Sequence, residues 1–368
     1  MDRSKLIPIL PFIYLLIYAV FIIATNSSVF GQSFDPQKAQ QRYFNSAYIK
    51  GDKADYILSD SELYTTEGFF LIQEGRDLKK ITPGHPPLGK YLIGISTYVF
   101  GSPIWLNFLF GLGVLLLIYL LASQFFSSKI SLLTMIVFSF EPLFLSTLTK
   151  TMLDVYLLFF SLLSVYFYLR WLKQDKFAYI FTSQLSLGLA FSSKIFISSV
   201  PLLAALVLTT LFTGNFKRFI DHTIAGVGIG FGFLIGHLSF FFHHPSLLDF
   251  ASYQRFILSW WVGSPQLVPG LVWDLIYRNR WHTWWGDGVV SVQSWWPGWP
   301  LFITLGLLSL PLDKISKRFD FKALPLYLWL LLSLLLFTFE AVYPRHLLII
   351  LPAAYLLSLR FLSIIKAT

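Results

Sequence analysis

Long apolar runs separated by short polar turns dominate the chain. A helix that crosses a bilayer needs about 20 mostly apolar residues, and ten segments reach or approach that length. They are residues 6–24, 103–125, 130–148, 152–171, 178–192, 195–212, 219–242, 298–311, 324–340 and 344–362. No tandem repeat divides them. The pattern therefore predicts an all-α polytopic membrane protein that forms a single domain over residues 1–368.

Composition supports this interpretation and removes several classes of protein. Hydrophobic residues make up 55% of the chain and charged residues 13%, and the mean hydropathy is +0.65, whereas about a quarter of a soluble domain is charged. The absence of cysteine excludes disulfides, thiolate metal sites and a cysteine nucleophile. The net charge of +9 comes mostly from short clusters between apolar runs, which favours contact with anionic membrane lipid over nucleic acid.

An eleventh apolar segment, residues 88–100, decides the orientation because it is too short to cross as a straight helix. If it stays on the outer surface, half of the 28 lysines and arginines fall at cytoplasmic ends of spans, as the positive-inside rule requires. If it crosses, the basic clusters from Lys129 onward face outward. The rule therefore predicts a juxtamembrane or re-entrant helix here. It also predicts ten spans in the plasma membrane, the first a retained anchor rather than a cleaved signal, with both termini in the cytoplasm.

This orientation leaves two long regions outside the cell, residues 26–102 and 243–297. The second region is rich in tryptophan, since nine of the twelve tryptophans lie between Trp260 and Trp299. An aromatic belt at the membrane interface is one interpretation. The alternative is that some of these rings line a groove for a peptide, a sugar or a prenyl chain.

Ionisable side chains near membrane spans mark function by default, because burying charge is costly. The predicted outer turns and the first loop contain Asp60, Glu62, Glu67, His85, Glu141, Lys150, Asp154, Lys194, Glu340, Arg345 and His346. A transporter is expected to place its charges near the membrane midplane, so the pattern favours an outer-face site. Structural alternatives stay open: Glu141 can pair with a neighbouring cation, Lys194 can snorkel, and Asp154 can cap a helix. We interpret His243, His244 and His282 as ordinary loop histidines, because no carboxylate stands beside them at ligand spacing.

The run from His85 to Lys90, HPPLGK, is the sharpest local signal. Its two prolines stiffen the approach to the membrane, and the helix behind them can direct backbone N–H groups at an anion. At this run the chain resembles the protein O-mannosyltransferases and, more distantly, the bacterial aminoarabinose lipid A transferases. Both are GT-C glycosyltransferases that use polyprenyl-phosphate sugars.

The resemblance continues in the same order along most of the chain. The matching elements are the acidic run 59–64, Glu141-Pro142 followed by Asp154, the stretch 188–194, the Trp-Pro run 294–300 and the Arg-His motif of residues 343–347. One departure is that the family's adjacent Asp-Glu pair is split here into Asp60-Ser61-Glu62. The resemblance implies a GT-C bundle of about 10–11 transmembrane helices, with juxtamembrane helices in the first outer loop.

The resemblance also implies roles for individual residues. Asp60 is the expected catalytic base, with Glu62 as the alternative, and Arg345 is expected to hold the lipid phosphate through its guanidinium fork. These two side chains must then meet in one pocket. The other expected substrate-binding residues are His85, Lys90, Glu141, Lys150, Asp154, Lys194, His346 and Trp299. The residues require no metal or cofactor, and they leave a divalent cation open.

The predicted activity is therefore inverting transfer of a sugar, mannose by resemblance, from a polyprenyl or dolichyl phosphate to Ser or Thr hydroxyls of exported proteins at the outer face. An alternative acceptor is a glycolipid or a cell-envelope glycan. A transporter or flippase is the less favoured class. The expected partners are the lipid-linked donor, the exported acceptor and membrane lipid, with no nucleic acid and the oligomeric state left open.

Overall fold

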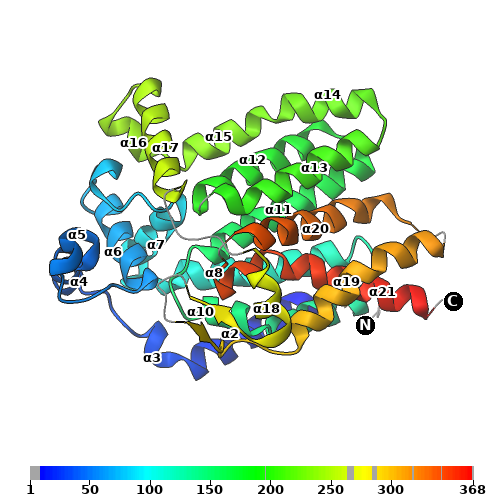
Figure 1. Ribbon diagram of the computed structural model, residues 1–368, viewed down its shortest axis with the longest axis horizontal. Coiled ribbons are helices and arrows are strands. Elements are labelled where there is room, and N and C mark those ends of the chain that lie inside the picture. The colour runs from blue at the N-terminus through cyan, green and yellow to red at the C-terminus, as the bar shows by residue number, and fades with distance from the viewer. Residues whose placement is uncertain are drawn as a thin grey trace.

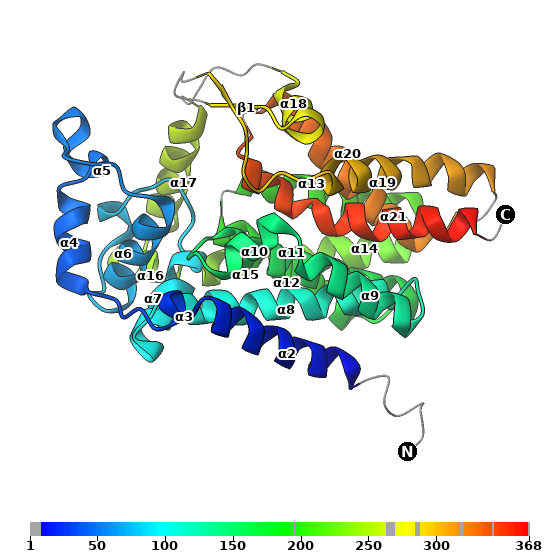
Figure 2. The ribbon, with the colours of Figure 1, turned by 90° about the horizontal axis from the view of Figure 1, so that it is seen from below.

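The computed structural model describes residues 9–194, 196–262, 269–283, 288–316, 319–340 and 342–366. Long helices lie side by side in a bundle, and a group of shorter helices covers one end of it (Figures 1 and 2). The bundle contains α2 (Leu10–Thr25), α8 (Ile104–Ala122), α9 (Ser128–Ser139), α10 (Pro142–Leu148), α11 (Asp154–Gln174), α12 (Phe177–Ser193), α13 (Val200–Phe212), α14 (Phe216–Ala225), α15 (Val227–Ile235), α19 (Gly298–Ile315), α20 (Leu324–Phe339) and α21 (Leu351–Ile365). All ten predicted spans thus coincide with helical segments.

The first loop forms most of the group that covers one end of the bundle (Figure 2). Its elements are α3 (Ser27–Phe30), α4 (Pro36–Phe44), α5 (Ala47–Lys50), the 3-10 turn η1 (Gly51–Lys53), α6 (Asp60–Ile72), η2 (Leu78–Lys80) and α7 (Leu88–Phe100). The short apolar segment of residues 88–100 is α7, and it packs on α6 within this group. The beginning of α2 and the end of α21 lie at the opposite end of the bundle (Figure 2).

The second long region contains the remaining elements. They are α16 (Leu238–His243), α17 (Leu247–Val262), α18 (Leu271–Arg278) and the two-residue antiparallel strands β1 (Trp281–His282) and β2 (Val289–Val290), with Trp281 opposite Val290. Three further 3-10 turns, η3 (Phe196–Ser199), η4 (Phe321–Ala323) and η5 (Pro344–Ile349), precede α13, α20 and α21. The structure therefore contains almost no sheet in the part it describes.

Four helical segments are long and apolar enough to cross a membrane, counted over the described residues: 104–122, 154–174, 216–235 and 321–339. The pair α9 and α10 is a fifth if its 71° bend is one broken span. The apolar helices α2, α13 and α21 are shorter. The chain is thus a multi-pass membrane protein, and several predicted spans are less regular than their hydropathy indicates.

The irregularities follow from proline and glycine. The predicted span 130–148 bends where Glu141 caps α10 and Pro142 begins it, because proline fits the first turn of a helix and not its interior. The expected span 219–242 is a membrane-length helical segment over residues 216–235, formed by α14 and α15, and the helix breaks at Gly236 before α16.

The glycines also bring backbones into close contact. A side chain at Gly188 of α12 would collide with the backbone of Ile229 in α15, and one at Gly232 would collide with the backbone of Leu185. The glycine-rich stretch therefore serves helix packing, as its position inside a span predicted. Gly68 of α6 and Gly94 of α7 approach each other in the same way, which fixes the two helices that carry the HPPLGK run and the acidic run.

Candidate active site

Four charged side chains from distant parts of the chain meet at the covered end of the bundle. Asp60 begins α6, Asp154 begins α11, Lys194 is the C-cap of α12, and Arg345 lies in η5. Each stands at a helix terminus or in a 3-10 turn, where a polar side chain can leave the apolar helix face. The expectation that Asp60 and Arg345 lie together is met by the structure.

The four side chains form a chain of alternating charges. Arg345 Nη2 lies 2.5 Å from Asp60 Oδ2, and Arg345 Nε lies 4.0 Å from Asp154 Oδ2. Lys194 Nζ in turn donates to Asp154 Oδ1 at 2.6 Å. The side chains of Asp154 and Lys194 are buried, whereas Asp60 is 29% exposed and Arg345 is 23% exposed. The pair of Asp60 and Arg345 is therefore the accessible part of the network.

Arg345 retains an unused hydrogen-bond donor. Its Nε is buried and finds no hydrogen-bond acceptor within the described part of the chain. A buried donor without an acceptor costs about 1–3 kcal/mol, and a guanidinium prefers an anion that takes two parallel bonds. The geometry thus suits an oxyanion that enters beside Asp60.

An aromatic ring packs on the guanidinium and is itself held by two further rings. The ring of Tyr343 lies 4.7 Å from the Arg345 guanidinium carbon, and Trp281 packs on Tyr343 with ring centres 5.2 Å apart. His346 also contacts Tyr343, at 5.7 Å between ring centres. These contacts hold the side chain of Arg345 in one orientation.

His85 lies beside the same network. Its ring packs edge-on against Tyr64 of α6, with centres 5.7 Å apart. Burial, reinforced by the positive charges of Lys194, Lys90 and Arg345, holds the pKa of His85 well below its usual 6.5. His85 is therefore neutral at physiological pH and can bind a sugar hydroxyl without adding charge.

His346 also lies beside the charge network, within electrostatic range of Lys194, Arg345 and His85. It lines a small enclosed cavity together with Asp154, Lys194 and Arg345. Two of the expected substrate-binding histidines thus lie next to the charge network.

Glu62, the alternative base, has a different environment from Asp60. Its carboxylate closes a capping box with Ser59 at the start of α6 and pairs with Arg42 Nη2 at 2.8 Å. Burial opposes its ionisation, but the bonds from Ser59 and the charge of Arg42 outweigh burial and lower the pKa of Glu62. Glu62 thus faces Ser59 and Arg42, whereas Asp60 faces Arg345, the residue expected to hold the phosphate, so its position favours Asp60 as the base.

Lys90 is committed to a buried ion pair. Its Nζ lies 2.8 Å from Glu67 Oε2, and both side chains are almost fully buried. The pair also binds both backbone polar groups of Thr82, because Lys90 donates to the Thr82 carbonyl and Glu67 accepts from the Thr82 N–H. The pair therefore fixes the loop that leads into the HPPLGK run and to His85.

Glu141 and Trp299 meet each other rather than the Asp60–Arg345 pair. Glu141 accepts hydrogen bonds from the indole N–H groups of Trp299 at 2.8 Å and Trp296 at 2.9 Å, and from the Tyr355 hydroxyl at 2.7 Å. No described lysine or arginine pairs with it, so the alternative of a neighbouring cation is wrong. The cluster joins the break between α9 and α10 to α19 and α21.

The tryptophans of the second region mainly secure it to the bundle. Trp273 donates to Thr338, Trp281 to the Val342 carbonyl, and Trp295 to the Ile276 carbonyl. Trp284 and Trp285, and the side chains of Trp260 and Trp261, lie outside the described residues. Hydrogen bonding by the indole N–H groups therefore explains part of the high tryptophan content of this region. The sequence alone indicated an interfacial belt or a ligand groove for these residues.

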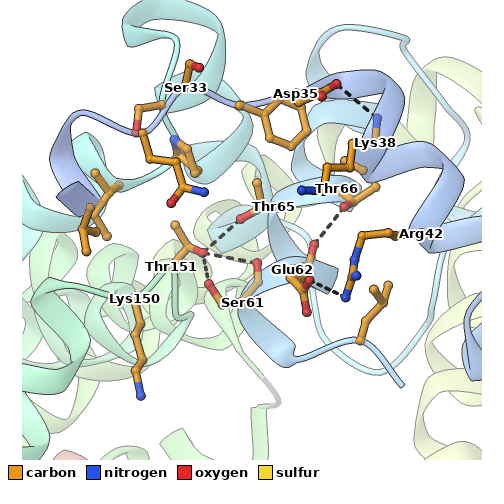
Figure 3. A pocket seen from close by; sticks show the side chains of 18 of the residues that line it. Ser33, Asp35, Lys38, Arg42, Ser61, Glu62, Thr65, Thr66, Lys150 and Thr151 are labelled. Carbon is orange, nitrogen blue, oxygen red and sulfur yellow. Dashed lines mark hydrogen bonds and ion pairs between the residues drawn. The ribbon is translucent and has the colours of Figure 1, made fainter. Parts of the chain in front are cut away.

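Lys150 lies apart from the charge network. Its side chain is exposed, and its backbone carbonyl accepts a hydrogen bond from Asn107. The side chain stands at the rim of a polar cavity that also contains Glu62 (Figure 3). The loop histidines serve as tethers, since His243 binds the Gly75 carbonyl, His244 pairs with Asp77 and His282 pairs with Asp274.

Sequence reasoning missed the aromatic residues that shape the site. Tyr48 lies within electrostatic range of Asp60 and Arg345, and burial raises its pKa to about 12. Tyr343 stacks on Arg345. A single tyrosine in a loop carries no periodic signal, although the position of Tyr343 two residues before Arg345 was a hint.

The described part of the chain has a GT-C type fold. Two solved structures share the fold, both of ArnT from Cupriavidus metallidurans. The apo structure matches with a TM-score of 0.60 and 13% identity over 95% of this chain and 60% of that chain. The structure bound to undecaprenyl phosphate matches with 0.59 and 15% over 93% and 60%. The present chain thus spans about 60% of the length of that protein.

The sequence adds a more particular resemblance over part of the chain. The profile of the dolichyl-phosphate-mannose-protein mannosyltransferase family matches residues 84–239, which confirms the predicted resemblance over that part of the chain. The matched segment contains the HPPLGK run, Glu141, Asp154 and Lys194. No curated protein matches the sequence.

Proposed function

We propose that this protein is an inverting glycosyltransferase that takes its sugar from a polyprenyl-phosphate donor at the outer face of the membrane. The observation that carries the proposal is the pair of Asp60 and Arg345, in which a carboxylate and an incompletely bonded guanidinium share one accessible site. The family match and the binding of undecaprenyl phosphate by ArnT, a protein of the same fold, support a lipid phosphate as the donor.

The reaction needs one base and one cation in contact with substrate. The carboxylate of Asp60 takes the proton of the acceptor hydroxyl as its oxygen bonds to the anomeric carbon of the sugar. The bond from that carbon to the phosphate oxygen breaks, and polyprenyl phosphate leaves with the electron pair. Arg345 stabilises the charge on the phosphate, and Lys194 supports it through Asp154. A single displacement inverts the anomeric configuration.

The neutral groups orient the sugar. His85 and His346 lie against the charge network and offer ring nitrogens to sugar hydroxyls. The prenyl tail lies between helices, so the donor enters sideways from the lipid. Lys90 acts indirectly, through the loop that its pair with Glu67 fixes.

For the acceptor, we propose Ser or Thr hydroxyls of exported proteins and, for the sugar, mannose, because the matching family is named for that reaction. A glycolipid or cell-envelope glycan is the second candidate. It is favoured by the polar cavity beside the first turn of α6, which is lined mainly by hydroxyl and charged groups (Figure 3).

Transfer from a labelled donor tests this proposal. Purified protein is incubated with polyprenyl-phosphate mannose and either a Ser/Thr-rich peptide or a glycan acceptor, and label on the acceptor is counted. We expect transfer by the wild type and none by Asp60→Asn. Mass spectrometry of secreted proteins from cells with and without this chain should show lost hexose on Ser or Thr. Donor flux across a vesicle membrane without transfer would instead indicate transport.

A further inference from the structure

A polar cavity of about 460 Å³ lies next to the catalytic pair and takes no part in the chemistry described above. Four segments form it: residues 29–42, residues 58–66 around the start of α6, residues 102–104 and residues 149–151 (Figure 3). Ser61 and Glu62 line this polar cavity, while the residue before them, Asp60, pairs with Arg345. The proposed base is therefore the direct neighbour in sequence of a residue that lines the cavity.

Hydroxyl groups form one wall of the polar cavity. The hydroxyls of Ser61 and Thr65 both hydrogen-bond to Thr151, and the side chains of Thr65 and Thr151 are buried (Figure 3). Ser102 is 4% exposed, and its Oγ finds no hydrogen-bond partner within the described residues. Buried polar atoms in native proteins are nearly always bonded to protein, water or ligand. The wall thus offers free hydrogen-bonding capacity to a molecule rich in hydroxyls.

The uncommitted charge at the polar cavity is positive. Its two carboxylates are already occupied, since Asp35 caps α4 through Lys38 N and Glu62 binds Ser59 and Arg42. By contrast, no carboxylate of the described chain lies within ion-pair distance of the Lys38 or Lys150 ammonium groups. Arg42 Nε is also buried without an acceptor. An anionic group on the ligand would satisfy these donors.

These features indicate what the polar cavity binds. We infer that it holds an anionic sugar unit, one that carries a phosphate or a carboxylate, belonging to the acceptor and next to the unit that receives the sugar. This inference rests on the proposed sugar transfer and on its second acceptor candidate, a glycolipid or cell-envelope glycan. Arg345 already accounts for the donor phosphate, and the cavity adjoins the residue that receives the acceptor proton. A peptide would instead require a free strand edge or apolar side-chain pockets, whereas hydroxyls and cations suit a charged sugar.

Two substitutions separate the cavity from the catalytic pair. Ala39→Phe fills the polar cavity, since Ala39 of α4 lines it, and Lys38→Glu reverses the charge of an uncommitted lysine. Lys53→Glu is the matched control, because Lys53 is an exposed lysine of the same loop that does not line the cavity.

The inference is tested by measuring the binding of glucose 6-phosphate to the full chain in nanodiscs. Saturation-transfer NMR detects the binding, and glucose and inorganic phosphate serve as comparison ligands. We expect glucose 6-phosphate to bind more tightly than either comparison ligand. Lys38→Glu should weaken its binding at least tenfold, Ala39→Phe should abolish it, and Lys53→Glu should leave it unchanged. Nanodiscs that contain phosphatidylinositol distinguish a lipid headgroup from a soluble sugar: competition by that lipid assigns the unit to a glycolipid, and lack of competition assigns it to a soluble glycan.

A second readout keeps this inference apart from the proposed function. Binding of polyprenyl phosphate should weaken about 10- to 100-fold in Arg345→Ala and stay unchanged in Lys38→Glu and Ala39→Phe. Absence of glucose 6-phosphate binding, or binding that Ala39→Phe does not change, overturns the inference while the donor result stands. Donor binding that Arg345→Ala leaves unchanged overturns the proposed function, and the sugar-phosphate titration still decides the role of the cavity.

Discussion

Replacement of Asp60 by asparagine tests the proposed base most sharply, because asparagine keeps the size of the side chain and removes only its charge. The amide oxygen can still accept a hydrogen bond from Arg345, whose Nη2 lies 2.5 Å from the present carboxylate. The capping box formed by Ser59 and Glu62 at the start of α6 does not involve Asp60. We therefore expect Asp60→Asn to insert and fold normally.

The expected sizes of the effects separate catalysis from folding. General-base help is worth about 10²- to 10⁴-fold in rate, or about 2.7–5.4 kcal/mol in activation free energy at ~1.36 kcal/mol per tenfold. The ion pair of Asp60 with Arg345 is partly exposed, and such pairs contribute about 0–1 kcal/mol to the free energy of unfolding. Asp60→Asn should thus lose transfer by at least about a hundredfold with little change in thermal stability.

Donor binding supplies an internal control in the same variant. In the wild type the Asp60 carboxylate competes with the lipid phosphate for Arg345, and the asparagine amide competes less. Polyprenyl phosphate should therefore bind to Asp60→Asn as tightly as to the wild type or more tightly. The assay measures label transfer, thermal unfolding and polyprenyl phosphate binding on the same preparation. Transfer within about threefold of wild type, with Glu62 intact, would refute the assignment of Asp60 as the base.

Other predictions follow from neighbouring contacts. Arg345→Ala should weaken polyprenyl phosphate binding about 10- to 100-fold by loss of charge-assisted bonds, and an equal weakening for the acceptor would contradict the phosphate role. Lys90→Met leaves Glu67 buried without its cation and should lower the free energy of unfolding by about 3–5 kcal/mol in chemical denaturation; unchanged stability would show that the pair is not structural. Glu141→Ala removes the acceptor of two indole N–H groups, at about 1–3 kcal/mol each, which thermal unfolding should detect. Burial lowers the pKa of His85 in the folded protein, so the unfolded chain binds one more proton than the folded chain as the pH falls through 6.5. The free energy of unfolding should therefore decrease over that pH range, and His85→Asn should make the decrease smaller. An identical pH dependence of unfolding in both proteins would contradict this prediction.

Hydropathy alone located the helices because the length of a span is set by the membrane. Each predicted span contains helix, and the short segment of residues 88–100 is α7 in the group that covers one end of the bundle. Hydropathy did not reveal the bend at Pro142 or the break at Gly236, since an apolar run reads the same whether it is straight or broken.

The sequence predicted which residues belong to the charge network but not which of them pair with each other. Ionisable residues at the predicted ends of spans indicated a site, and the resemblance to a known family selected Asp60 and Arg345 among them. Which acid pairs with which base depends on side-chain packing between separate elements of the fold. Lys90 with Glu67 and Glu141 with the tryptophans illustrate this, because each has a partner that its own local sequence does not indicate.

The polar cavity had no counterpart in the sequence analysis. Its hydroxyls come from four separate segments, and serines or threonines in loops are too common to signal a site. Only the fold shows that Ser61 and Glu62 turn toward this cavity while Asp60 turns toward Arg345.

The central claim is that the carboxylate of Asp60 and the guanidinium of Arg345 act on one lipid-linked substrate. A cryo-EM structure of the full chain with polyprenyl phosphate in a nanodisc tests it most directly. The account predicts phosphate density within hydrogen-bond distance of Arg345, with Asp60 beside it and the prenyl tail between helices. Phosphate density at the opposite end of the bundle, for example beside the buried pair of Arg360 and Asp313, would contradict it.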